Sequence, residues 1–85
     1  MSGFEIAQLA KKCLVELTGH QPDTVSFMTK DEAGWHVNVD MVELKRIPAV
    51  TDVLSTYETV LDEEGNLVSY QRTRRYQRGQ VSEES

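Results

Sequence analysis

The chain has 85 residues, of which 39% are hydrophobic and 27% charged, and its formal net charge is -5. A chain of this length forms one small domain with little room for a deep cavity, so its function is expected to lie mostly on its surface. The single cysteine excludes an internal disulfide, and no apolar run approaches the roughly 20 residues that cross a bilayer, so a cytoplasmic protein without membrane contact is expected.

The first predicted element is an amphipathic helix. Ser2 and Glu5 have the spacing of a capping box, in which each side chain accepts a hydrogen bond from the backbone N–H of the other residue at a helix start. Gly19 is expected to end the helix, and Pro22 prevents it from resuming. Apolar residues at helical spacing predict the face that is buried: Phe4, Ala7, Ala10, Leu14 and Leu17.

A β-hairpin is predicted next, from two stretches in which apolar and polar side chains alternate, residues 24–29 and 34–41. The residues between them suit a three-residue loop closed by glycine, which pairs Asp31 with Trp35. This register brings the apolar residues of both strands to one face. They complete the expected core: Val25, Phe27, Trp35, Val37, Val39 and Met41.

The pattern changes phase after Met41, because Val42 and Leu44 are apolar at the opposite parity. A β-bulge, a strong twist, or a strand covered on both faces would each explain this change, and the sequence does not choose between them. Residues 45–50 are predicted to be a loop, because Pro48 cannot donate to a central ladder.

Residues 53–61 and 67–76 predict a second hairpin, joined by a turn of the same type. The expected pairs are Asp62 with Asn66, Leu61 with Leu67, Val60 with Val68, Glu58 with Tyr70, Thr56 with Arg72 and Leu54 with Arg74. The predicted fold is therefore α+β, with one N-terminal helix packed on a four-stranded antiparallel meander. Residues 1–79 form this single domain, and residues 80–85 are expected to be a flexible acidic tail.

The candidate residues for catalysis and metal binding have more ordinary explanations. His36, Asn38 and Asp40 share one face of a strand, but His36 and Asp40 would stand about 13 Å apart, too far to ligate one metal ion. Cys13 lies in or beside the apolar stripe of the helix and is expected to be a buried small hydrophobe. No catalytic residue, metal site or cofactor is predicted.

The segment from Tyr70 to Gln80 is the most unusual stretch, because it holds four arginines and no acid in an otherwise acidic chain. In a regular strand Tyr70, Arg72, Arg74 and Tyr76 share one face. Such a row suits a carboxylate-bearing protein partner or stacked bases, or the arginines pair with Glu43, Asp52 or Glu58 on a solvated face. All three interpretations remain open from the sequence.

Residues 34–78 resemble the gas vesicle protein O family. The matching motifs are the tryptophan-led strand at Trp35, the Glu-Leu-x-Arg-Ile-Pro loop from Glu43 to Pro48, the Asp-Val-Leu-x-x-Tyr-Glu strand from Asp52 to Glu58, and the Arg-x-x-Arg-Tyr ending at residues 72–76. The resemblance implies a non-enzymatic accessory factor needed for making the gas-filled protein shell. Members of the family that it resembles often carry a longer charged N-terminal extension.

The expected function is therefore gas vesicle assembly in the cytoplasm, in association with gas vesicles and through contact with other gas vesicle proteins. Self-association through strand edges is a second mode that the fold would permit. The alternative is a single-stranded nucleic-acid-binding regulator of gas vesicle genes, which the acidic body of the chain disfavours. The residues expected to bind partners are Arg46, Ile47, Pro48, Tyr70, Arg72, Arg74, Arg75, Tyr76 and Arg78.

Overall fold

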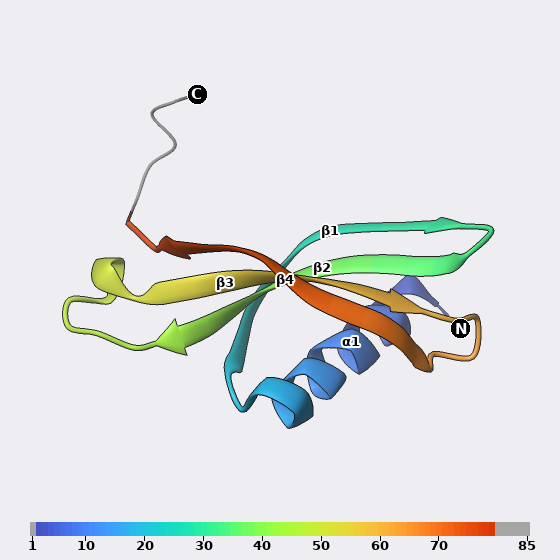
Figure 1. Cartoon of the computed structure of the whole chain (residues 1–85), viewed down its shortest axis with the longest axis horizontal. Helices are drawn as coiled ribbons and strands as arrows, with labels where there is room; N and C mark the ends of the chain where they lie inside the picture. Colours follow the sequence, from blue (N-terminus) through green and yellow to red (C-terminus); the bar gives the residue numbers. More distant parts are fainter. Residues whose placement is uncertain (1, 80–85) are drawn as a thin grey trace.

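The computed structural model describes residues 2–79 and confirms the α+β fold with its meander topology. The elements are α1 (Gly3–Thr18), β1 (Gln21–Asp31), β2 (Gly34–Leu44), the short 3-10 helix η1 (Ala49–Thr51), β3 (Val53–Leu61) and β4 (Leu67–Gln77). The four strands form one antiparallel sheet in the order β1-β2-β3-β4, and α1 packs on one side of it (Figure 1). The tail expected at residues 80–85 lies outside the described residues.

Both ends of α1 are capped as predicted. The Ser2 hydroxyl accepts a hydrogen bond from the Glu5 backbone N–H at 3.2 Å, and the Glu5 carboxylate accepts one from the Ser2 N–H at 3.0 Å. Gly19 ends the helix with a φ of 77° and donates its N–H to the carbonyl of Val15 at 2.9 Å. The local sequence therefore sets the length of the helix.

The buried face of α1 is centred on Ile6, Ala10 and Leu14, which are fully buried. The predicted burial of Phe4 and Leu17 is wrong, since 73% of Phe4 and 51% of Leu17 are exposed. Phe4 lies two residues before Ile6 and so points to the opposite side of the helix, whereas Leu17 lies in the last turn. The hydrophobic core comprises Ile6, Ala10, Leu14, Val37, Val39, Met41, Tyr57 and Leu61, with Leu9, Val15, Val25, Trp35 and Leu67 partly buried against it.

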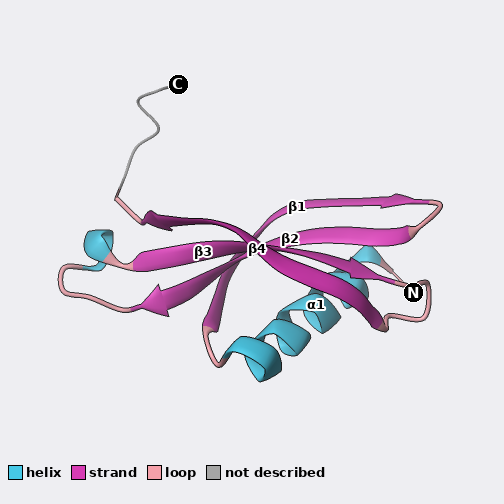
Figure 2. Cartoon of the chain, viewed as in Figure 1, coloured by secondary structure: helices cyan, strands magenta, loops and turns pink. Residues whose placement is uncertain are grey.

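The first hairpin has a shorter loop than predicted, because Asp31 pairs with Gly34 and not with Trp35. This register alone places Phe27 opposite Asn38, on the face of the sheet away from α1, and the extra residue Ser26 then brings Val25 opposite Val39. The predicted burial of Phe27 is therefore wrong, and 54% of its surface is exposed. Figure 2 shows α1 on one side of the strands, and in the described part of the chain no long helix covers the other side.

The phase change after Met41 is a β-bulge, one of the three interpretations that the sequence left open. Val42 pairs with Leu54 and Leu44 pairs with Val53, so Glu43 is an extra residue in β2. The Glu43 side chain therefore lies on the helix side of the sheet, the same side as the buried Met41 two residues before it. Leu54 is 1% exposed although it lies outside the main core cluster.

The turn of the second hairpin is correctly predicted, but the register beyond it is wrong. The Asp62 N–H donates to the Asn66 carbonyl at 2.8 Å, and Leu61 pairs with Leu67. Extra residues at Val68 and Thr73 in β4 then shift the pairing, because each bulge inverts the parity of the following residues. Val60 faces Ser69 and not Val68, Glu58 faces Gln71 and not Tyr70, Thr56 faces Arg74 and not Arg72, and Leu54 faces Tyr76 and not Arg74.

Candidate partner-binding surface

The β2–β3 connection and the end of β4 meet at one end of the molecule, opposite the two hairpin turns (Figure 1). Two backbone hydrogen bonds join them: the Arg78 N–H donates to the Asp52 carbonyl at 2.7 Å, and the Gly79 N–H donates to the Val50 carbonyl at 2.6 Å. This end carries most of the residues that the sequence singled out. We call it the basic end and define it by Lys45, Arg46, Ile47, Pro48, Arg72, Arg74, Arg75, Tyr76 and Arg78.

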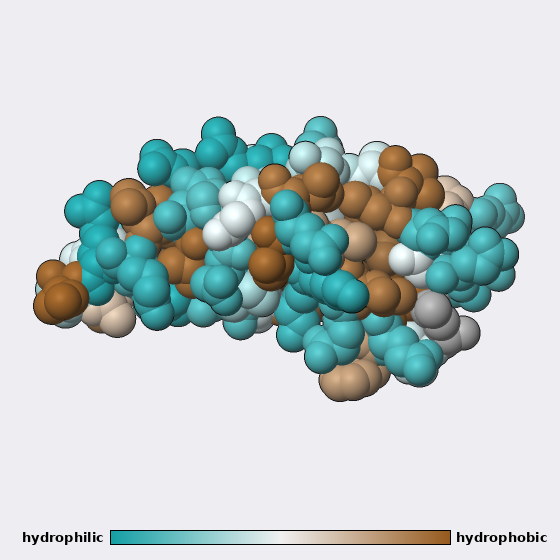
Figure 3. Space-filling model, turned by 90° about the horizontal axis from the view of Figure 1, so that it is seen from below, coloured by the Kyte–Doolittle hydropathy of each residue, from teal (hydrophilic) through white to brown (hydrophobic). Residues whose placement is uncertain are grey.

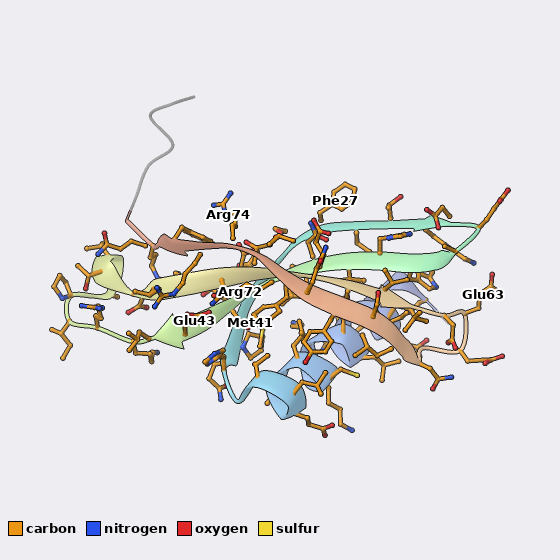
Figure 4. All side chains as sticks on the ribbon, viewed as in Figure 1. Phe27, Met41, Glu43, Glu63, Arg72 and Arg74 are labelled. Carbon is orange, nitrogen blue, oxygen red and sulfur yellow. The ribbon has the colours of Figure 1, made fainter. Side chains whose placement is uncertain are left out.

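The opposite end of the molecule is acidic. The two hairpin turns lie there side by side, and Lys30 of the first reaches Glu63 of the second at 3.8 Å between Nζ and Oε2. The turns contribute Asp31, Glu32, Asp62, Glu63 and Glu64. Charge is thus segregated along the long axis of the molecule, and Figure 4 shows Glu63 and Glu43 toward opposite ends.

On the helix side of the sheet, Glu43 binds two of the four arginines. Arg75 donates from Nε to Glu43 Oε1 at 2.8 Å, and Arg72 donates from a terminal nitrogen to Oε2 at 3.1 Å. The hydroxyl of Ser55 also donates to Oε2. The Glu43 side chain is only 11% exposed, whereas about half of each arginine side chain remains in solvent, at 53% for Arg72 and 55% for Arg75.

These contacts hold Glu43 in its ionised form. Burial by itself would raise the pKa of the Glu43 carboxyl, but the hydrogen bonds from Ser55, Arg75 and Arg72 outweigh it and lower the pKa to about 2. The carboxylate is therefore charged at any physiological pH. It links the bulge of β2 to β3 and β4.

Tyr76 and Arg74 lie on the other face of the sheet. The Tyr76 hydroxyl donates to Asp40 at 2.8 Å, and the guanidinium of Arg74 lies 4.3 Å from the centre of the Tyr76 ring. Burial and the hydrogen bond to Asp40 raise the pKa of Tyr76 to about 12. Figure 4 shows Arg74 pointing away from the side that carries Arg72 and Glu43.

The predicted row of Tyr70, Arg72, Arg74 and Tyr76 on one face is therefore wrong. The bulge at Thr73 places Arg72 opposite Tyr57 and Arg74 opposite Thr56, which are adjacent residues of β3 and face opposite sides of the sheet. Tyr70 lies on the helix side, with its ring 6.4 Å from that of Tyr57 and away from the basic end. The four residues do not form one continuous binding strip.

Arg78 closes the basic end by binding two carboxylates. Its Nε donates to Asp52 at 3.2 Å, and a terminal nitrogen donates to Asp23 of β1 at 3.1 Å. The ion pairs anticipated with Glu43 and Asp52 are thus present. The pair with Asp23 was missed, because a partner 55 positions away in the sequence leaves no local signal.

Asp52 also fixes the loop that contains Ile47 and Pro48. Its buried carboxylate accepts the Arg46 backbone N–H at 2.7 Å, and this bond, followed by the contact with Arg78, holds the pKa of Asp52 below its ordinary value. Thr51 donates to the Pro48 carbonyl from its backbone N–H at 3.0 Å and from its hydroxyl at 2.7 Å. The peptide bond between Ile47 and Pro48 is cis.

The loop displays apolar side chains to solvent. Ile47 is 100% exposed and Val50 is 56% exposed. In Figure 3, the view from the helix side, hydrophobic surface lies at the end of the molecule that carries this loop. The loop therefore combines an ordered backbone with apolar surface and the cations Lys45 and Arg46.

Three further properties of the described residues bear on what the chain can bind. A shallow groove of about 270 Å³ on the face away from α1 is lined by Phe27, Thr29, Asp31, His36, Asn38 and Glu58. Within residues 2–79, no three His, Cys, Asp or Glu side chains gather to hold a metal ion. Over the same residues, no helix has the length and apolar character needed to span a membrane.

Comparisons with known proteins identify close relatives. The family model described as gas vesicle synthesis protein GvpO matches residues 1–82. Gas vesicle protein O of a Streptomyces species is 46% identical over 66 residues, which are 78% of this chain and 52% of that protein. Gas vesicle protein O1 of Halobacterium salinarum is 31% identical over 75 residues, which are 88% of this chain and 63% of that protein. No solved structure matches the chain.

The matched part of this chain spans between half and two thirds of the length of these two relatives. A third relative, gas vesicle protein O of Haloferax mediterranei, is 37% identical over 51 residues, covering 60% of this chain and 36% of that protein.

Proposed function

Because the chain belongs to the gas vesicle synthesis protein GvpO family, we propose that it is a non-enzymatic accessory factor of gas vesicle assembly that binds other gas vesicle proteins. The binding surface is the basic end, and the partner is a shell subunit or another accessory protein. The chain acts in the cytoplasm, where vesicles are built. The single observation that carries this proposal is a cationic, partly apolar surface on a chain of net charge -5.

The charge at the basic end supports recognition of an acidic protein surface. Six cations lie there, Lys45, Arg46, Arg72, Arg74, Arg75 and Arg78, against the four carboxylates of Asp23, Asp40, Glu43 and Asp52. Within residues 2–79, no side-chain ion pair is made by Lys45, Arg46 or Arg74, so these cations are available to a partner. Complementary charge of this kind speeds association and selects the partner.

The strand edges support the proposal less well than the basic end. The extra residues Asp23 and Ser26 lie in β1, and Val68 and Thr73 lie in β4, so both edge strands carry two bulges. Bulges interrupt the regular row of backbone groups that an added strand would pair with, and they are a common defence against edge-to-edge association. Self-association by strand addition is therefore disfavoured as the main binding mode.

The nucleic-acid alternative is weakened because Tyr70 and Tyr76 do not share one face of the sheet. Stacking of successive bases requires aromatic side chains along one groove, and these two tyrosines lie on opposite faces of the sheet. An electrophoretic shift of a single-stranded oligonucleotide at low salt, lost steeply as salt is added, would revive this alternative.

Affinity purification of the tagged chain from vesicle-forming cells tests the proposal. The test variant is Lys45→Gln/Arg46→Gln/Arg74→Gln, and the matched control is Lys11→Gln/Lys12→Gln/Lys30→Gln, which removes the same charge from other surfaces. We expect the original chain and the control to retain one or more gas vesicle proteins and the test variant to lose them. Equal retention by a folded test variant would rule out the basic end, and retention of no gas vesicle protein by any of the three would refute the function.

A further inference from the structure

The loop at the basic end exposes apolar side chains that do not pack in the hydrophobic core. Ile47 is the most exposed large hydrophobic side chain among residues 2–79, and its neighbours Leu44 and Val50 are 43% and 56% exposed. Isolated exposed hydrophobic residues are ordinary, but three of them between Leu44 at the end of β2 and Val50 in η1 favour contact with another molecule. The three lie beside the cations of the basic end.

The backbone that carries Ile47 is held in place before any partner binds. The Asp52 carboxylate fixes Arg46 on one side of Ile47, and Thr51 fixes the Pro48 carbonyl on the other. The connection is further tied to the end of β4 by the Gly79 N–H, which donates to Val50. An ordered loop loses little conformational entropy on binding, which is the usual property of an anchor residue in an interface.

The surroundings of Ile47 define the chemistry of its partner. Lys45 and Arg46 precede it, and within residues 2–79 neither side chain is neutralised by an ion pair. A surface complementary to this loop therefore has an apolar pocket at its centre and carboxylates on its rim.

A second copy of the chain fits this description less well than a different protein. The groove on the face away from α1 has two carboxylates, Asp31 and Glu58, but Phe27 is the one apolar side chain among its six lining residues. A second, smaller groove is lined by Glu58, Val60, Ser69, Tyr70 and Gln71. Both grooves are too polar and too open to bury an isoleucine. The occupant is therefore expected to be a different protein.

We infer that Ile47 is the anchor of the partner interface, entering an apolar pocket with an acidic rim on another gas vesicle protein, while Lys45 and Arg46 contact the rim. This inference rests on the proposed function. In this arrangement Arg72 and Arg75 hold β4 against Glu43, and the loop that carries Ile47 makes the contact with the partner.

The test is a calorimetric titration of the full chain with the purified gas vesicle protein that affinity purification retains. Ile47→Ala is expected to weaken binding by about 10- to 100-fold, since removing most of a buried aliphatic side chain costs about that factor. Ile47→Leu should bind within a few-fold of the original chain. Val68→Ala is the matched control, because Val68 is also β-branched and 62% exposed but lies beside the acidic hairpin turn.

The dependence of binding affinity on salt distinguishes the role of Ile47 from that of Lys45 and Arg46. Ile47→Ala should leave the dependence of affinity on salt unchanged, whereas Lys45→Gln/Arg46→Gln should make it shallower. Unchanged binding by Ile47→Ala to a partner that the original chain does bind would overturn the inference and leave the proposed function standing. No binding by the original chain would overturn both, and concentration-dependent self-association that Ile47→Ala abolishes would show that the occupant is a second copy.

Discussion

Arg75 on β4 reaches across β3 to Glu43 on β2, with 2.8 Å between Nε and Oε1, although β2 and β4 are not neighbours in the sheet. Arg72 approaches the same carboxylate at 3.1 Å, and the Ser55 hydroxyl donates to it from the strand between them. Glu43 therefore joins three strands at a point beyond the helix-covered core. The edge strand is held at the basic end by this cluster and by Arg78.

Removing the charge of Glu43 should destabilise the fold. Glu43→Gln leaves two guanidinium groups without their counter-charge and is expected to lower the free energy of unfolding by about 1–3 kcal/mol, as for other hydrogen-bonded charges. Urea denaturation followed by circular dichroism measures this. The control is Glu58→Gln on the neighbouring strand, where the side chain is exposed, and equal stability of the two variants would show that the cluster contributes nothing.

The same carboxylate predicts a specific loss of stability in acid. The pKa of Glu43 is about 2 in the folded protein against an ordinary 4.5, so its contribution is complete above about pH 4.5 and is lost as the pH falls toward 2. The half-exposed arginines reduce the effect, which we place on the order of 2 kcal/mol. Unfolding curves recorded from pH 6 to pH 2 should show this loss. The loss should be smaller in Glu43→Gln, and parallel pH profiles would contradict the assignment.

Two glycines with positive φ should respond differently to alanine. At Gly34, with a φ of 127°, an added Cβ would lie 2.3 Å from the Leu61 carbonyl oxygen, so the two strands would have to move apart. At Gly19, with a φ of 77°, an added Cβ meets nothing within 4 Å. We expect Gly19→Ala to cost about 1 kcal/mol from backbone conformation alone and Gly34→Ala to cost at least about 1 kcal/mol more. Thermal denaturation of both variants provides the comparison.

The orientation of the helix can be tested with two leucines of α1. Leu14→Ala removes a fully buried side chain and should lower the free energy of unfolding by about 2–5 kcal/mol. Leu17→Ala removes a side chain that is 51% exposed and should cost less than about 1 kcal/mol. A larger loss for Leu17→Ala would mean that the helix is rotated or shifted on the sheet.

The sequence predicted those features that local chemistry determines. The capping box at Ser2, the αL glycine at Gly19 and the Asp62–Asn66 turn are all formed by residues a few positions apart. The order of the strands follows from their short connections. These features required no knowledge of distant residues.

The faces of the strands were predicted less well, because they depend on the exact loop length and on bulges. A single extra residue inverts the side of every residue that follows it, and the bulges at Ser26 and Thr73 have no distinctive local sequence. The bulge at Thr73 separated Arg72 from Arg74, whereas Phe27 is exposed because the loop of the first hairpin is one residue shorter than predicted. The arrangement of the candidate residues as a single row was therefore wrong, and the assignment of these residues to partner binding stays a prediction.

Site-specific photo-crosslinking in vesicle-forming cells shows whether the basic end contacts another gas vesicle protein. A photoreactive amino acid is placed at position 47 in the basic end or, in a separate variant, at position 64 in the acidic turn. Both positions are exposed, so neither substitution should disturb the fold. We expect crosslinks to a gas vesicle protein from position 47 and none from position 64. Crosslinks from position 64 alone would mean that the basic end is not the contact surface.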